Sequence, residues 1–273
     1  MKLRTALSAI LIGLASFAAL AQEVPHVHLK HRVFAQWGYN RAQYSLSNIH
    51  FEGPDYDFIL HDVAAVDKPE PFSFRGYFSP ANIWIPQYNY RVGWFLNERW
   101  SISLGLDHMK YVMVQDQDVR ITGNIAPQRS ATYAGSEDHT VALTTDFLRY
   151  EHTDGLNLLS VDADVYEPVW NSTHGAHALY LTAGACIGPV IPRTDVRLFG
   201  VGLNNKFHLA GYGAALEAGF TGVFWNRLLV RAMAKGGYIE LPSVLTTGTD
   251  VDRARQHFWF MQEYATVGVL IGK

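Results

Sequence analysis

Two short stretches of the 273-residue sequence place a histidine beside carboxylates, the minimum set for general acid–base catalysis. A carboxylate can orient an imidazole and stabilise its charged form, so either histidine could accept a proton from a reacting group. The candidate catalytic residues are His152, Glu151 and Asp154 in one stretch, and His108 and Asp107 in the other. The first stretch also fits a strand end followed by an Asp-Gly turn, so a purely structural role is the alternative.

The N-terminus has the three parts of a secretory signal peptide. Lys2 and Arg4 give a positive start, an apolar run extends from Ala6 to about Ala19, and Ala19-Leu20-Ala21 fits a signal-peptidase site. The sequence predicts cleavage after Ala21, so that residues 1–21 are removed. An uncleaved anchor is the alternative, but the apolar run is shorter than the roughly 20 residues that a spanning helix needs.

The sequence after Gln22 contains no apolar run long enough for a spanning helix, so a membrane segment would have to consist of strands in a closed barrel. Aromatic residues make up 13% and charged residues 17%, the latter below the roughly 25% typical of soluble domains. The net charge of −3 gives no basic footprint, so nucleic acid is not an expected partner. The single cysteine, Cys186, excludes an intramolecular disulfide.

Apolar and polar residues alternate with a period of two through much of the sequence. Between residues 87 and 96, Tyr90, Val92 and Trp94 share one face of a strand, and Asn89 and Arg91 share the other. A short turn at 97–99 leads into the same pattern at 100–112, and a turn at 225–227 joins two further strands. The sequence predicts hairpins with short periplasmic turns, whose apolar faces meet lipid and whose polar faces line a lumen.

The predicted fold class is all-β: a single antiparallel transmembrane β-barrel of about 10–12 strands that spans residues 22–273. Less regular strands are expected at 32–44, 56–66, 119–125, 140–152, 156–166, 195–201 and 258–271. Polar stretches are expected as extracellular loops at 53–55, 67–86, 126–138, 168–175 and 241–255. A soluble periplasmic barrel or sandwich is the alternative, and it would need the apolar faces turned inward.

The face assigned to the lumen carries both signs of charge. We expect interlocking ion pairs, because a charge in a narrow barrel is costly unless it is paired or hydrated. The lumen residues are Arg91, Glu217, Arg231, Lys235, Asp162 and Asp164, with Asp107 beside them. Glu217 with Arg231 or Lys235 is the favoured pair, since a short turn joins their strands. A water-filled pore is the alternative.

No pattern in the sequence requires a metal or a cofactor, and we expect neither. His26, His28 and His31 could bring two imidazoles to one side of an extended chain, a possible metal site. A solvated N-terminal segment is the preferred interpretation.

In this layout the chain resembles the uncharacterised outer-membrane β-barrel proteins of Gram-negative bacteria, over its whole mature length. The resemblance implies outer-membrane lipid or lipopolysaccharide and the barrel-assembly machinery as partners, and a structural, binding or small-channel role around a narrow, charge-filled lumen. Outer-membrane lipid A deacylases, acyltransferases and phospholipases place catalytic groups at the lipid-facing rim. The alternative function is therefore an enzyme that acts on lipid acyl chains through the His/carboxylate cluster. None of their sequence signatures is present, so no residue role is carried over. Such barrels also commonly end in an aromatic residue, whereas this sequence ends Ile271-Gly272-Lys273.

Overall fold

The computed structural model describes residues 27–135, 138–202, 206–247, 249 and 251–272. The predicted signal peptide, its cleavage after Ala21, and His26 lie outside the described residues and stay predictions.

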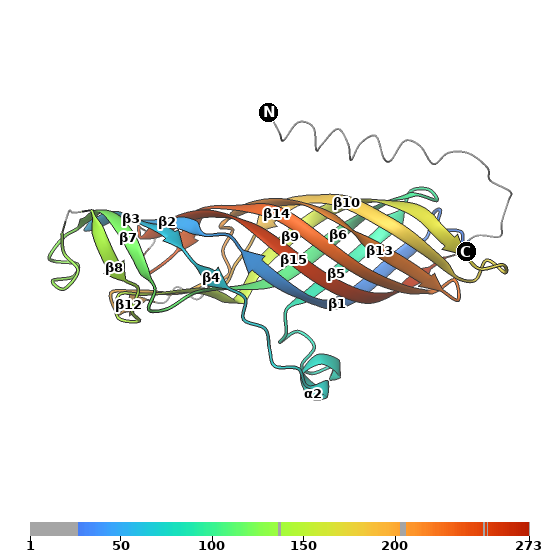
Figure 1. Cartoon of the computed structure of the whole chain (residues 1–273), viewed down its shortest axis with the longest axis horizontal. Helices are drawn as coiled ribbons and strands as arrows, with labels where there is room; N and C mark the ends of the chain where they lie inside the picture. The colour runs from blue at the N-terminus through green and yellow to red at the C-terminus, as the bar shows by residue number, and fades with distance from the viewer. Residues whose placement is uncertain (1–26, 136–137, 203–205, 248, 250, 273) are drawn as a thin grey trace, which may run out of the picture.

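Within the described residues, eight antiparallel strands form a closed ring (Figure 1). In ring order they are β1 (Val33–Tyr44), β5 (Tyr88–Phe95), β6 (Trp100–Met113), β9 (Leu148–Asn171), β10 (Ala178–Val190), β13 (Gly211–Phe224), β14 (Leu228–Leu245) and β15 (Arg253–Ile271). The ring closes where β1 pairs with β15, from Val33 opposite Ile271 to Tyr44 opposite Phe260. The all-β barrel prediction is thereby confirmed.

The remaining strands prolong the barrel into an extension at the end opposite the C-terminus (Figure 1). They are β2 (Ser47–Gly53), β3 (Tyr56–Val63), β4 (Ala65–Val66), β7 (Asp118–Ile125), β8 (His139–Ala142), β11 (Asp195–Leu198) and β12 (Val201–Gly202). The β2–β3 hairpin joins β15 where Glu52 lies opposite Arg253, and β7 and β8 follow in the sheet.

The ring therefore has eight strands and not the expected 10–12. The expected strand at 140–152 is divided between β8 and the start of β9, and the one at 156–166 lies within the same β9. The segments at 56–66, 119–125 and 195–201 pair in the extension. Their alternation matches that of the ring strands, so the pattern alone does not separate the two groups. The expected extracellular loop at 168–175 is also misplaced, because β9 runs to Asn171 and the connection to β10 lies at the short-turn end, with 97–99 and 225–227.

Side-chain polarity inverts along the barrel. In the ring the outward residues are apolar: Tyr90, Val92, Ile102, Leu104, Leu216, Phe220, Met261 and Val267 are all exposed. In the extension Phe51, Phe58, Phe147 and Tyr150 are buried inside. A single strand, β15, contains both arrangements, since Arg255 and His257 point outward on the extension side of Trp259, and Trp259, Met261 and Val267 point outward in the ring. The apolar outer surface of the ring is called the belt below, and it excludes the inward-facing alternative.

The lumen is filled at three successive levels. At the short-turn end an apolar cluster includes Val27, Leu29, Phe34, Phe95 and Leu229. A charged layer follows, and the large apolar cluster of the extension lies beyond it. Residues 27–29 contribute to the first cluster, where the backbone N–H of Leu29 donates to Glu98 over 2.8 Å.

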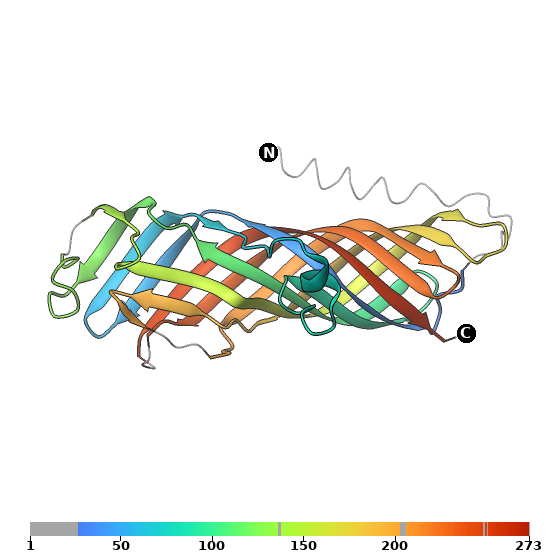
Figure 2. The ribbon, with the colours of Figure 1, turned by 90° about the horizontal axis from the view of Figure 1, so that it is seen from below.

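A segment at 67–86, called the arm, leaves the barrel wall sideways and carries the five-residue helix α2 (Phe74–Phe78) (Figure 2). Ser73 caps α2, since its hydroxyl accepts the N–H of Gly76 over 3.0 Å. Tyr77 ties the arm to β1, because Arg41 donates to its hydroxyl over 3.0 Å. Among the described residues, no helix is long and apolar enough to cross a membrane.

Candidate functional site

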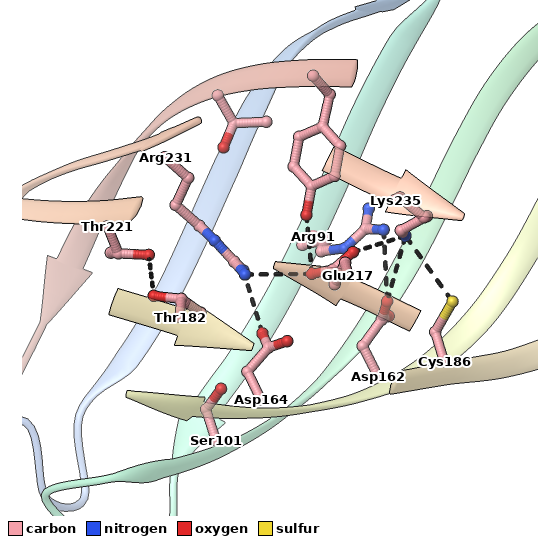
Figure 3. Close-up of polar contacts among 12 residues, drawn as sticks. Arg91, Ser101, Asp162, Asp164, Thr182, Cys186, Glu217, Thr221, Arg231 and Lys235 are labelled. Atoms are coloured by element: carbon pink, nitrogen blue, oxygen red, sulfur yellow. Dashed lines mark hydrogen bonds and ion pairs between the residues drawn. The ribbon is translucent and has the colours of Figure 1, made fainter. Parts of the chain in front are cut away.

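The charged layer is a continuous ion-pair network inside the ring (Figure 3). Lys235 Nζ lies 2.9 Å from Asp107 and 2.9 Å from Glu217. Arg91 lies 2.8 Å from Asp107 and 3.3 Å from Asp162. Arg231 lies 3.1 Å from Asp164 and 3.2 Å from Glu217. Each of these side chains is at most 2% exposed.

Neutral side chains complete the network. Tyr264 donates its hydroxyl to Glu217 over 2.8 Å, and Ser160 donates to Asp162 over 3.0 Å. Cys186 is buried with its Sγ 3.7 Å from Lys235 Nζ. The described residues named in this network include three cations and four carboxylates. Each of them has an oppositely charged group within 4 Å, which offsets the cost of its burial.

The structure thus brings together all six residues assigned to the lumen, and Asp107 with them. Arg231 and Lys235 both contact Glu217, which is possible because β13 and β14 pair directly. Asp107 was also a candidate catalytic residue, but it faces the lumen and lies away from the rim. Sequence reasoning missed Tyr264, although its alternation against Glu263 places it on the inward face.

His152 lies inside the extension, beyond the belt, and not on the rim. Its ring is fully buried beside Tyr111 and Tyr150, and its Nδ1 lies 2.9 Å from the Thr194 hydroxyl. Its Nε2 has no hydrogen-bond partner within the described part of the chain. Burial lowers the pKa of the imidazole from 6.5 to about 3. His152 is therefore a neutral core histidine at physiological pH.

Glu151 does not contact His152. It forms ion pairs with Arg149 and with Lys68, the latter at 3.4 Å. The structure therefore does not bring these two predicted catalytic residues into a dyad.

His108 occupies the rim position that the sequence also assigned to His152. It points outward from β6, stacks on Tyr88 with ring centroids 4.7 Å apart, and places Nδ1 2.8 Å from the Asn157 side-chain oxygen. The Asn157 amide is oriented in turn, because its NH₂ donates to the Ile191 carbonyl over 3.0 Å. Nδ1 of His108 therefore carries the proton and Nε2 is the basic nitrogen.

A bulge in β9 directs Asp154 toward this histidine. Met109 lies opposite Leu156 and Tyr111 opposite His152, so three residues of β9 face one residue of β6. Gly155, with φ +123°, accommodates the kink. Asp154 then pairs with Arg193 at 3.4 Å on the outer side of the barrel.

Two adjoining cavities meet at His108 and Asp154. One, of about 310 Å³, is mainly apolar and is lined by Tyr88, Leu106, Asn157, Leu159, Ile191 and Phe207 besides these two. The other, of about 390 Å³, lies between the barrel and the arm and is lined by Lys68, Glu70, Trp84, Ile85, Lys110, Thr153 and Arg193 besides the same two. His108, Asp154 and the two cavities are called the rim site. Sequence reasoning missed Arg193 and the arm residues, which lie far from His108 along the chain.

In the described part of the chain, no group of three or more His, Cys, Asp or Glu side chains is placed to hold a metal ion. The expectation that the chain needs no metal remains a prediction.

No protein-family model matches the sequence, and no curated protein matches it either. Solved structures of outer-membrane barrels are similar in fold. The outer membrane protein AlkL is 8% identical over 93% of this chain and 96% of its own, with a TM-score of 0.37. OprG from Pseudomonas aeruginosa is 10% identical over 90% and 99%, with a TM-score of 0.39. The outer membrane protease OmpT from Escherichia coli is 7% identical over 94% and 100%, with a TM-score of 0.27.

Similarity at this level indicates neither a ligand nor an activity. The class of the protein follows from its own architecture: a closed antiparallel ring with an apolar belt outside and polar side chains inside is an outer-membrane-type β-barrel.

The ion-pair network predicts a large cost for removing one buried charge. Lys235→Met leaves Asp107 and Glu217 each short of a partner, so we expect the free energy of unfolding to fall by about 3–5 kcal/mol. Urea unfolding in lipid vesicles, followed by tryptophan fluorescence, measures it. Arg120→Met, which removes an exposed cation paired with Asp138, is the control and should leave the unfolding midpoint in place. Equal behaviour of the two variants would contradict an energetically important network.

Burial of His152 predicts a specific pH dependence of stability. The unfolded chain takes up a proton near pH 6.5, whereas the folded chain does so only near pH 3. This contribution to stability is complete above pH 6.5 and is lost as the pH falls below it, by about 2 kcal/mol at pH 5 at about 1.36 kcal/mol per pKa unit. His152→Gln should remove that part of the pH dependence, and His174→Gln, which changes an exposed histidine, should not. Parallel pH curves for wild type and His152→Gln would show that the ring is accessible to protons.

Proposed function

We propose that this protein is an outer-membrane β-barrel that does not conduct, and that it acts through structural and binding surfaces on its outside. The belt supports the membrane location, because its exposed Val, Leu, Ile and Phe side chains suit hydrocarbon and not water. Aromatic residues lie at both ends of the belt, with Trp37 stacked on Tyr88 at 4.4 Å at one end and Trp94, Trp100 and Trp225 exposed at the other.

The filled lumen carries this proposal. An eight-stranded ring has an interior that side chains alone can fill. Here the charged layer is packed between two apolar clusters, with Phe34 and Phe95 on one side and Met109 and Tyr111 on the other, all buried. A path for ions would have to cross all three levels, so the structural and binding roles are favoured over the channel role.

Planar-bilayer recording tests the closed lumen. Purified, folded protein should give no discrete conductance steps at roughly 100–200 mV. Each 100 mV supplies about 2.3 kcal/mol to a unit charge that crosses the bilayer. A porin reconstituted in the same lipid serves as the positive control. Reproducible steps from the wild-type protein would overturn the proposal and restore the small-channel role.

A second candidate function is hydrolysis of a lipid acyl ester at the rim site. The observation that favours it is the orientation of His108 by Asn157, with Nε2 as the basic nitrogen beside an apolar cavity. In this reaction Nε2 takes a proton from water as the water oxygen bonds to the ester carbonyl carbon. The same proton then passes to the leaving alcohol oxygen as the ester C–O bond breaks, which yields a fatty acid and an alcohol.

Fatty-acid release from radiolabelled phospholipid and lipid A in mixed micelles tests this activity. His108→Gln should lower the rate by about 10²–10⁴-fold, the usual contribution of a general base. His152→Gln should leave the rate unchanged, since that ring is enclosed in the extension. No release by the wild-type protein, or full activity of His108→Gln, would remove the enzyme as a candidate.

A further inference from the structure

The two cavities of the rim site differ in chemistry and in their level on the barrel. Leu106 and Leu159, which line the apolar cavity, point outward from β6 and β9 beside the belt residues Leu104 and Val161. The polar cavity lies farther toward the extension, beneath the arm. An occupant of both would need an apolar part at the level of the belt and a polar part above it.

The polar cavity contains charged side chains of both signs, and each of its cations pairs with a carboxylate: Lys68 with Glu151, Lys110 with Glu70 and Arg193 with Asp154. Lys110 is only 8% exposed in its side chain, and its Nζ lies 3.0 Å from Glu70 of the arm. A desolvated ammonium beside a guanidinium offers several charged donors to one compact anion, and phosphate oxygens suit such donors.

We propose that the rim site binds a phosphate-bearing acyl lipid of the surrounding leaflet. An acyl chain lies in the apolar cavity between Leu106 and Leu159, and the phosphate lies between Lys110 and Arg193, with the arm as its cover. Free phosphate would leave the apolar cavity unused, and an uncharged lipid would make no use of the charged N–H donors that Lys110 and Arg193 keep beyond their pairs with Glu70 and Asp154. This inference rests on the proposed binding role and names its ligand class.

The arm gives the site a second means of holding the lipid. Phe72, Phe74 and Phe78 of the arm are 63–77% exposed, and α2, which contains Phe74 and Phe78, projects from the side of the barrel (Figure 1). Because lipid surrounds the belt, these rings can bury themselves in the same leaflet from which the ligand comes. The arm then stays closed over the polar cavity through the Lys110–Glu70 pair and the bond from Arg41 to Tyr77.

Native mass spectrometry of the full chain in detergent micelles tests the site with four probes: lipid A, phosphatidylglycerol, diacylglycerol with the same chains, and inorganic phosphate. We expect retention of the phosphorylated lipids and of neither other probe. Comparison of lipid A with phosphatidylglycerol shows which of the two phosphorylated lipids the site prefers.

Two variants test the two cavities separately. Lys110→Met with Arg193→Gln should weaken retention of the phosphorylated lipid about tenfold or more, since each hydrogen bond between charged groups contributes on the order of a factor of ten. Leu159→Trp should do so by filling the apolar cavity. The matched controls are Arg120→Gln, an exposed cation of the extension, and Leu104→Trp, an outward belt residue that does not line the cavity.

The shift in gel mobility on heating verifies that each variant is folded. Equal retention of diacylglycerol and phosphorylated lipid, or unchanged retention in both test variants, would overturn the proposal. Conductance separates the lipid-site proposal from the closed-lumen proposal. A protein that conducts ions but retains the lipid refutes only the closed lumen. A protein that does not conduct and retains no lipid refutes only the lipid site.

Discussion

Closure of the ring is the constraint on which the rest of this structure depends. The pairing of β1 with β15 leaves no strand edge in the belt, where lipid could not satisfy free backbone groups. Closing with eight strands also fixes a narrow bore. Within that bore the side chains of Arg91, Arg231 and Lys235 are at most 1% exposed, so their charges need carboxylates across the lumen, and each has one. The charged layer is thus a consequence of strand number as much as of sequence.

The alternation of single strands could be predicted from the sequence, but their partners could not. Residues 87–96 show their two faces locally, because side chains of a strand alternate whatever it pairs with. β3 alternates equally well, yet it pairs with β2 and β7 in the extension. Whether a strand belongs to the ring is decided by contacts between segments far apart in the chain, and these leave no local pattern. The expected 10–12 strands therefore became a ring of eight with an extension.

The same limit explains the site. His152 and His108 each lie near carboxylates in the sequence, but the residues next to a histidine do not show whether its side chain points outward. The bulge opposite Lys110 decides it, since it turns Asp154 outward while His152 stays in the core. Ion pairs across one hairpin, such as Glu217 with Lys235, could be anticipated because the turn sets the register. The positions of Arg193 and Glu70 could not be anticipated in this way. Arg193 lies in the loop after β10 and Glu70 lies in the arm, and only the tertiary fold brings them to His108 and Lys110.

The inversion of side-chain polarity along β15 has a mechanical consequence. On the extension side of Trp259 the outward positions hold Arg253, Arg255 and His257. On its other side they hold Met261, Ala265 and Val267, with Glu263, opposite Arg41, as the charged residue among them. Sliding the barrel outward would bring apolar side chains into water, and sliding it inward would force charged ones into hydrocarbon, so displacement in either direction is opposed. The strand thereby sets the depth at which the barrel is inserted in the bilayer. A fixed depth in turn keeps the arm and His108 at one height relative to the lipid head groups.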